Sequence, residues 1–408
     1  MPWAETEPVN ERLRFWQDFQ RGIFRFNELC EVYGISRNTG YKLVRRVLEE
    51  GLAGAVHDRS RAPLSCPHRT DEALADALVE IRRMHRTWGP KKIIAYLERH
   101  VPGYAWPAPS TVGEILKRRG MIQPRRRRPR PGHPGRGETA PIEPNAVWTA
   151  DFKGHFRTRD SFYCYPLTVV DGFSRYLLAC KALPSTEHAG AQPVFERLFR
   201  DFGLPKVIRT DNGIPFATQA VRRISQLSVW WIKLGITPEL NDPSHPEQNG
   251  SHERMHRTLK DEATKPPAAN WRAQQRPFDR FVLEYNEERP HEAIGQRTPH
   301  SIYRSSPRPY PARIPTVEYP AHFEVRRVSR NGGIRWKHSS STGRNNGWLN
   351  VSHVLAEENV GLEEVHDGIW SVYFGPVLLG RFDERELKLY GDLNKVRTKP
   401  KVSPMLPV

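Results

Sequence analysis

The sequence is a 408-residue chain with a strongly basic composition: 63 Lys and Arg stand against 46 Asp and Glu, a formal net charge of +17. This length exceeds one ordinary hydrophobic core and predicts two to four domains. The high charge favours a polyanionic partner, and nucleic acid fits best. The four cysteines form no C-x-x-C pair, which argues against a cysteine-rich zinc site or a disulfide framework and favours a reducing cytoplasm. The sequence shows neither a signal-peptide pattern nor an apolar run of membrane-spanning length.

Residues 1–62 carry the pattern of a compact helical unit. Apolar residues repeat at helical spacing over 13–19 and again over 26–33, and a glycine turn ending in Ser36, a candidate N-cap, precedes a third helix over 37–50. This is the helix-turn-helix layout, although an ordinary three-helix bundle with a solvated basic face is the alternative. The third helix would present these residues to DNA: Arg37, Asn38, Thr39, Lys42, Arg45 and Arg46.

Residues 68–122 repeat this organisation and predict a second helix-turn-helix domain. Thr70 is the candidate cap of a helix over 71–86, a second helix covers 91–100, and a third begins at 109 and ends at 119. Two such domains in tandem suit a protein that must find a defined DNA end. The expected DNA contacts of the third helix are Ser110, Thr111, Lys117 and Arg118.

A linker rich in Arg, Pro and Gly covers 123–144. Its prolines extend the chain, and we expect its arginines to follow the phosphate backbone rather than form an inert spacer. The arginines that carry this prediction are Arg125, Arg126, Arg127 and Arg128.

Residues 145–305 show strands first and then alternating helices and strands, which indicates a mixed, five-stranded α/β sheet. The predicted strands cover 147–152, 163–170, 176–182, a segment from 207 that ends at Asp211, and a short segment after Thr237. The predicted helices cover 189–202 and 218–234, and a further helix carries Glu253.

Beyond a proline-rich linker over 306–320, residues 321–391 predict a small β-barrel, and 392–408 form a basic tail. A flexible polar loop is expected over 339–347. The predicted strands cover 323–328, 334–336, 348–351, 360–365, 369–374 and 377–381.

Three carboxylates carry the chemistry of this chain. Asp151 and Asp211 each end an apolar strand, where side chains of one sheet can converge at its edge, and Glu253 begins a helix that can pack against that edge. Three convergent carboxylates can hold two Mg²⁺ or Mn²⁺ ions about 3.5–4 Å apart. Such a pair of ions activates water or a 3′-hydroxyl and stabilises the leaving oxygen of a phosphodiester. Four and seven residues after Glu253, Arg257 and Lys260 lie on the same helical face and can hold a DNA strand, although Arg257 could instead pair with Glu253.

Other acids and the nearby histidines are weaker candidates. Asp171 lies in an Asp-Gly turn that explains its presence. Asp160 and Asp242 lie beside loops, and we expect Asp261 and Glu262 to face solvent. The spacing of three histidines fits no common zinc ligand set, so we expect surface or DNA-facing positions for most of them: His245, His252 and His256.

The segment 145–303 resembles the catalytic core of the retroviral-integrase superfamily of DDE transposases. The resemblance rests on five ordered motifs, W-T-A-D-F, D-G-F-S-R, R-T-D-N-G-I-P-F, H-P-E-Q-N-G-S-H-E-R-M-H-R-T-L-K and Y-N-E-E-R-P-H with a later T-P. With two helix-turn-helix domains before it, the chain is similar to bacterial insertion-sequence transposases. The resemblance implies an RNase H-like fold, Mg²⁺ dependence and a metal-binding catalytic triad of Asp151, Asp211 and Glu253. It also implies that Arg257 and Lys260 match DNA-contacting positions of the family. Asn249, in the loop before Glu253, is a further expected DNA contact.

Two features depart from the family pattern. Between Asp211 and Glu253 lie 253 − 211 − 1 = 41 residues, more than in many relatives, and Glu247 stands where the family usually has Gln. The role of that loop is therefore open.

The leading hypothesis is a transposase that binds terminal inverted repeats, nicks the 3′ ends and joins them to target DNA, as a homo-oligomer on double-stranded DNA at the bacterial nucleoid. A DNA-binding regulator with an inactive core and a plain RNase H-like nuclease are the alternatives. The regulator would bind DNA without metal-dependent cleavage, and the nuclease would hydrolyse DNA without joining strands.

Overall fold

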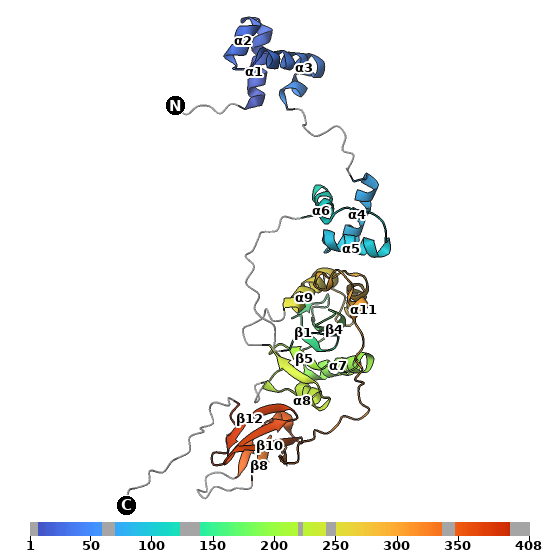
Figure 1. The fold of residues 1–408 in the computed structure, drawn as a ribbon, viewed down its shortest axis with the longest axis vertical. Coiled ribbons are helices and arrows are strands. Elements are labelled where there is room, and N and C mark those ends of the chain that lie inside the picture. Colours follow the sequence, from blue (N-terminus) through green and yellow to red (C-terminus); the bar gives the residue numbers. More distant parts are fainter. Residues whose placement is uncertain are drawn as a thin grey trace, which may run out of the picture. The chain divides into compact units, whose positions relative to one another are not determined.

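The computed structural model describes residues 7–58, 70–122, 139–218, 223–241, 250–336 and 347–391 (Figure 1). The chain divides into two compact units, Met1–Thr70 and Asp71–Val408. No helix in these described ranges is both long enough and apolar enough to cross a membrane.

The first unit consists of α1 (Pro8–Arg21), α2 (Phe26–Val32) and α3 (Arg37–Val56) around a small core that includes Phe15. Ser36 accepts a hydrogen bond from the backbone N–H of Thr39 at 3.2 Å, so the predicted N-cap is confirmed. Helix α3 extends past the predicted residue 50 through a kink at Gly51. A Cβ at Gly40 would lie 2.8 Å from Sγ of Cys30, which explains why glycine occupies the point where α2 and α3 meet.

The second unit begins with three further helices, α4 (Glu72–Met84), α5 (Pro90–His100) and α6 (Pro109–Arg118). Fully buried Trp88 lies in their shared core. The predicted cap at Thr70 is wrong, because Asp71 holds the N-cap position of α4 and no side chain caps that end. The apolar spacing had located the helix correctly, but the cap rule identifies terminal residues only within one or two positions.

A mixed sheet forms the centre of the second unit. The strand order is β2-β3-β1-β5-β6, and β4 also pairs with β3. Strand β1 runs antiparallel to β3 and parallel to β5, and β5 runs parallel to β6. The sheet has six strands rather than the predicted five, because the two-residue β2 also pairs with β3. The strands are β1 (Val147–Phe152), β2 (Phe156–Arg157), β3 (Tyr163–Asp171), β4 (Leu177–Leu183), β5 (Val207–Thr210) and β6 (Thr237–Leu240).

Helices cover both faces of this sheet. Helices α7 (His188–Phe202) and α8 (Gln226–Lys233) pack on Trp148 and its neighbours, whereas α9 (Gly250–Ala263) and α10 (Gln275–Leu283) pack on the opposite face. Burial on both faces explains the continuous apolar strands. The other helical segments of the described residues are a π-helical turn η3 (Glu284–Glu288), a 3₁₀ turn η4 (Glu292–Ile294), α11 (Pro299–Ile302) and, in the C-terminal part, a 3₁₀ turn η5 (His353–Leu355).

Helix α8 is shorter than predicted. It begins at Gln226 rather than at residue 218, because Ser225 is its N-cap and accepts a hydrogen bond from the N–H of Ser228 at 3.2 Å. Before the cap, Thr218 donates from its hydroxyl to the carbonyl of Ile224 at 2.6 Å.

The C-terminal part contains a four-stranded antiparallel sheet in the order β12-β11-β10-β7 and a separate two-stranded sheet, β8-β9. All six predicted strands are present, but the described residues contain no closed barrel, so barrel closure stays a prediction. Residues 392–408 and all but the last residue of the 339–347 loop lie outside the described ranges. The strands are β7 (Glu324–Arg327), β8 (Gly333–Arg335), β9 (Trp348–Asn350), β10 (Asn359–His366), β11 (Ile369–Phe374) and β12 (Val377–Asp383).

Candidate active site

The two aspartates lie at the carboxyl-terminal ends of two neighbouring strands of the mixed sheet. Parallel strands β1 and β5 pair Ala150 with Thr210. One residue further along each strand come Asp151 and Asp211, so the register brings the two carboxylates to neighbouring positions. The sequence predicted this convergence from strand ends alone.

Glu253 approaches the same edge from the first turn of α9. The side of α9 that carries His252, Met255 and Leu259 is buried against the sheet, while Glu253 is exposed. The negative charge of Glu253 raises the pKa of Asp151, so the two carboxylates lie within electrostatic reach of each other. Arg257 and Lys260 are also exposed on this helix, which agrees with the predicted cationic face beside the glutamate.

The site is short of positive charge. Burial, followed by the charges of Asp211 and Glu253, raises the pKa of Asp151 from 3.8 to about 7, although the N–H of Phe152 and the Lys153 ammonium act in the opposite direction. Burial also raises the pKa of Asp211. Carboxylates held together in this way bind protons or cations strongly, because either one removes their mutual repulsion.

The residues present fit divalent cations. Three carboxylates supply the oxygen ligands that Mg²⁺ and Mn²⁺ prefer. Gly213 donates its backbone N–H to Oδ1 of Asp211 at 3.2 Å, and a Cβ at this glycine would lie 3.0 Å from Oδ2. The absence of a side chain at residue 213 therefore leaves room for the carboxylate of Asp211.

Two histidines on α9 are buried, which corrects the expectation of surface or DNA-facing positions. His252 is 1% exposed and His256 is 7% exposed. Burial lowers the pKa of His252 to about 3 and, with the charge of His252 and Lys153, lowers that of His256 to about 2. Both imidazoles are therefore neutral. The remaining histidine, His245, lies outside the described residues.

These histidines converge on Thr168 of β3. The Thr168 hydroxyl lies 2.6 Å from Nε2 of His252, 2.7 Å from Nε2 of His256 and 3.0 Å from the carbonyl oxygen of Asp151. A hydroxyl has one proton, so all three contacts are hydrogen bonds only if Thr168 donates to Asp151 and accepts from both imidazoles. Nδ1 of His252 then accepts from the hydroxyl of Thr149 at 3.0 Å.

This hydrogen-bond network reaches Asp151 and raises the question of a separate metal site. Asp151, His252 and His256 offer ligand atoms within 4.8 Å of one another and could by geometry hold a metal ion. Both ring nitrogens of His252 already hold hydrogen bonds, however, and Nδ1 of His256 lies 3.9 Å from Oδ2 of Asp151. The arrangement suits a positioning role for Thr168 and His256 better than a separate metal site. Helical spacing with Met255 and Leu259 was the sequence signal for this buried face.

The competing acids have structural roles. Asp171 accepts hydrogen bonds from the N–H of Asn145 at 2.7 Å and from the N–H and hydroxyl of Ser174 at 2.8 and 2.6 Å, as expected for a turn residue. Asp160 likewise caps its own turn, and Asp242 lies outside the described residues. Asp261 is exposed as expected. Glu262 is not solvent-facing, because it forms an ion pair with Arg289 at 2.9 Å.

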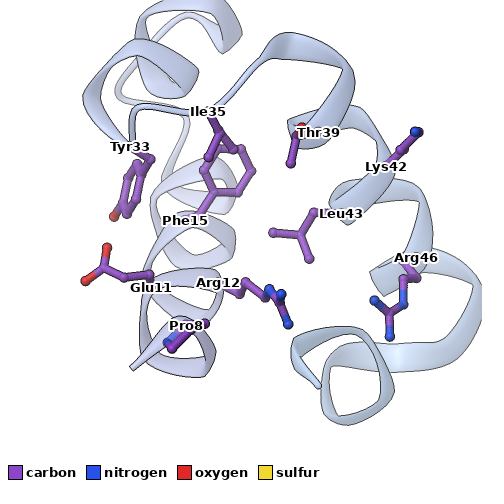
Figure 2. Close-up of a pocket in the computed structure, with 10 residues that line it drawn as sticks. All are labelled: Pro8, Glu11, Arg12, Phe15, Tyr33, Ile35, Thr39, Lys42, Leu43 and Arg46. Atoms are coloured by element: carbon purple, nitrogen blue, oxygen red, sulfur yellow. The ribbon is translucent and has the colours of Figure 1, made fainter. Parts of the chain in front are cut away.

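The expected DNA contacts are mostly exposed where the structure describes them. Arg46 differs, because its guanidinium donates to the carbonyl oxygens of Gly54 and His57 at 3.0 and 2.6 Å and so holds the end of α3. A cavity of about 400 Å³ lies beside it between α1 and α3 (Figure 2). Residues 125–128 and Asn249 lie outside the described ranges. The exposed positions are Arg37, Asn38, Thr39, Lys42, Arg45, Ser110, Thr111, Lys117 and Arg118.

A carboxylate site on a mixed sheet flanked by helices agrees with the matches to known families. Two models described as integrase core domain match residues 141–246 and 234–299, and a homeodomain-like domain matches residues 39–116. Together the first two cover the site and the sheet that carries it. Over 141–299 the chain is thus similar to integrase core domains, and the segment before it is similar to homeodomain-like domains.

The chain is similar to parts of retroviral polyproteins. The chain is 36% identical over 125 residues to the Gag-Pol polyprotein of baboon endogenous virus (strain M7), covering 30% of this chain and 7% of the polyprotein. It is 33% identical over 122 residues to the Pol polyprotein of radiation murine leukemia virus (strain Kaplan), covering 30% of this chain and 20% of that protein. The chain thus spans a small part of the relatives it matches.

Solved structures give weak overall superpositions. The HTLV-2 integrase catalytic core domain in complex with magnesium (trimeric form) is 18% identical, with 40% of this chain and 99% of that chain covered and a TM-score of 0.32. A simian T-cell lymphotropic virus intasome in complex with PP2A regulatory subunit B56 gamma is 18% identical, with 74% and 97% covered and a TM-score of 0.35.

Proposed function

We propose that this protein is a DDE-type transposase, a polynucleotidyl transferase that nicks the 3′ ends of a DNA element and joins them to target DNA. The observation that carries the proposal is the convergence of Asp151 and Asp211 on adjacent parallel strands, with the charge of Glu253 acting on Asp151. The integrase core domain matches over 141–299 support the same class of reaction.

Asp151, Asp211 and Glu253 would hold two Mg²⁺ or Mn²⁺ ions. Bound there, the ions supply activation of a water or 3′-hydroxyl and stabilisation of the leaving oxygen in an in-line displacement. Around them, Gly213 keeps space for Asp211, and Thr168 holds the backbone of Asp151 through its carbonyl. Exposed Arg257 and Lys260 would hold the phosphates of the strand being cut.

The partners we propose are terminal inverted repeats and target DNA. The recognition helices would be α3 and α6, whose exposed faces carry the expected contacts, and the arginines of the 123–144 linker would follow the phosphate backbone. Joining two ends requires at least two protomers bridged by DNA. An origin in a bacterial insertion sequence, with the protein at the nucleoid, is part of the same proposal.

The test replaces each of two acids by its amide. Asp151→Asn and Glu253→Gln should abolish Mg²⁺-dependent nicking and joining of labelled element ends but leave end binding unchanged in fluorescence anisotropy. Asp261→Asn, which removes an exposed carboxylate from the same helix as Glu253, is the matched control and should retain both activities. Joining that survived both amide substitutions would refute the triad.

The same assay separates the alternatives. An inactive regulator binds ends but shows no metal-dependent cleavage in the unsubstituted protein. An RNase H-like nuclease releases hydrolysis products and never forms the branched strand-transfer product.

A further inference from the structure

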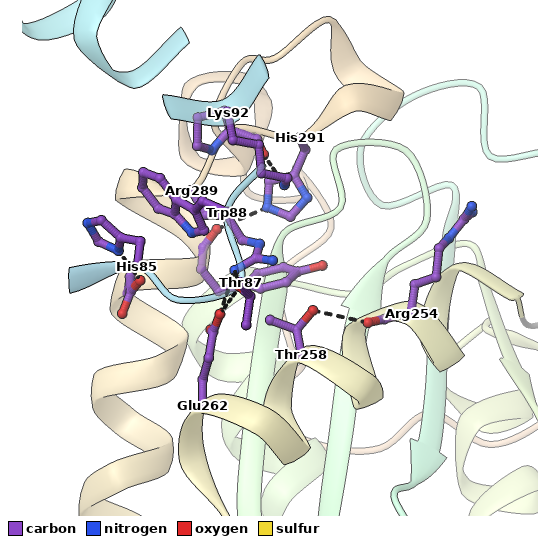
Figure 3. Close-up of polar contacts among 12 residues, drawn as sticks. His85, Thr87, Trp88, Lys92, Arg254, Thr258, Glu262, Arg289 and His291 are labelled. Carbon is purple, nitrogen blue, oxygen red and sulfur yellow. Dashed lines mark hydrogen bonds and ion pairs between the residues drawn. The ribbon is translucent and has the colours of Figure 1, made fainter. Parts of the chain in front are cut away.

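The Y-N-E-E-R-P-H segment, Tyr285–His291 in this chain, takes no direct part in the carboxylate site. Its first half fixes it to the sheet, because Asn286 accepts from the N–H of Leu177 at 2.8 Å and donates to the carbonyl of the same residue at 2.9 Å. Its second half, which carries Arg289, contacts another part of the chain (Figure 3). This segment therefore joins the sheet to a second partner.

That partner is the loop between α4 and α5. The guanidinium of Arg289, 7% exposed, donates to Oε1 of Glu262 at 2.9 Å and to the hydroxyl of Thr87 at 3.1 Å. The Thr87 hydroxyl in turn donates to Glu262. A triangle of charge-assisted hydrogen bonds thus joins the helical domain formed by α4, α5 and α6, the segment after η3, and the helix α9 that carries Glu253.

Further contacts flank this triangle on both sides. Nδ1 of His85 lies 2.8 Å from the carboxylate of Glu284. Lys92 donates to the carbonyl of Pro290, and Arg99 donates to that of Glu288 at 2.7 Å. These donors come from one domain and all the acceptors come from η3 and the residues that follow it. The exposed edge of this interface is an ion pair between Lys91 and Glu292 at 3.2 Å.

Part of the interface is shielded from water, and the helical domain's own core holds the loop that enters it. Burial, followed by the charge of Arg289, lowers the pKa of Lys92 to about 7, as expected for an ammonium removed from water. The ring of His85 stacks on fully buried Trp88 at 3.7 Å between centroids. The helical domain's own core therefore fixes the loop that presents Thr87.

We propose that Tyr285–His291, with Glu262 and Glu292, forms a docking site for the α4–α6 domain of the same chain, and that docking immobilises α9. Glu262 and Glu253 belong to the same helix, so the contact that holds Glu262 also restrains the helix that carries the third acid. Docking would give the α6 recognition helix a fixed position relative to the carboxylate site. This docking proposal does not depend on whether the protein joins DNA strands.

Two other occupants are less consistent with these contacts. DNA phosphates would compete for Lys92 and Arg99, but both cations are already satisfied by backbone carbonyls of the core. A second copy of the α4–α6 domain could use the same chemistry in place of the chain's own. The test therefore includes a dependence on protein concentration.

The test is hydrogen–deuterium exchange of the full-length chain without DNA or metal. Thr87→Val removes the shared hydroxyl but leaves the Arg289–Glu262 pair. We expect exchange to rise about 5- to 10-fold together in 85–92, in 286–292 and in the last turn of α9. Slow exchange around Leu78 and Val112 would show that the helical domain remains folded.

A charge swap gives a second, independent measurement. Lys91→Glu alone should raise exchange about 2- to 5-fold on both sides of the interface, and Lys91→Glu with Glu292→Lys should restore the original rates. Lys117→Glu on α6 makes the same change of charge away from the interface and should have no effect on these segments.

Three results would overturn the proposal. Exchange that rises on one side of the interface only would mean that the two surfaces do not protect each other. Failure of the double charge swap to restore the rates would mean that Lys91 and Glu292 do not face each other, which contradicts the docked arrangement. Protection that disappears on dilution would assign the docked domain to a second copy.

Discussion

The burial of Asp151, together with the negative charges of Asp211 and Glu253, predicts an unusual pH dependence of stability. Asp151 has a pKa of about 7 in the folded protein against 3.8 for an unperturbed aspartate. Because the pKa of Asp151 is higher in the folded than in the unfolded protein, the stabilisation that this group contributes is fully present below pH 3.8 and is lost as the pH rises toward 7. Each unit between the two values costs about 1.4 kcal/mol, so the metal-free protein should lose about 3 kcal/mol between pH 5 and pH 8 from this group.

Urea unfolding can isolate this contribution, because the core beside β1 contains Trp148, Trp230 and Trp231 as fluorescent probes. Asp151→Asn has no carboxyl at this position, so the stability difference between the wild type and Asp151→Asn should change by about 3 kcal/mol across the same pH range. Saturating Mg²⁺ should abolish the change in the wild type, because the cation stabilises the buried carboxylate charge and offsets the repulsion by Asp211 and Glu253. Parallel pH profiles of the two metal-free proteins would refute the reasoning.

Three substitutions near the site have expected magnitudes. Arg209 and Glu239 form an ion pair across β5 and β6, and both side chains are 8% exposed. Arg209→Met should therefore lower the free energy of unfolding, measured in urea, by about 3–5 kcal/mol, and the double variant Arg209→Met with Glu239→Gln should lower it less. Equal losses in the two variants would contradict the pairing. Thr168→Val should weaken Mn²⁺ binding about tenfold by calorimetry, whereas Thr168→Ser retains the hydroxyl and the affinity. Gly213→Ala should weaken Mn²⁺ binding by a similar factor, because its Cβ would crowd Asp211. Gly250→Ala, whose Cβ would meet no atom of the described residues within 4 Å, is the control, and equal effects of the two substitutions would contradict the steric explanation.

Strand positions and the acids at their ends were predictable from the sequence. The predicted 147–152 strand agrees with β1 at both ends, and Asp211 directly follows β5. Continuous apolar residues reveal a strand buried on both faces, and an acid that ends such a run stands at the sheet edge. Local pattern therefore sufficed for these strands and for the acids at their ends, although it misplaced the cap of α4 and the start of α8.

Long-range partners were not predictable in this way. Glu262 looked like a solvent-facing acid, because its partners Arg289 and Thr87 lie 27 and 175 residues away. His252 and His256 share the spacing of a buried helical face, but their burial depends on hydroxyls from two separate strands. One of these is Thr168, 84 residues before His252. A polar side chain is buried only where such partners exist, and periodicity does not report them.

Anomalous diffraction from crystals soaked in Mn²⁺ would locate the cations themselves. Our interpretation predicts anomalous peaks in coordination contact with Asp151, Asp211 and Glu253, and their loss in crystals of Asp151→Asn. Peaks elsewhere in the second unit, with these three carboxylates unoccupied in the wild type, would contradict the assignment of the triad.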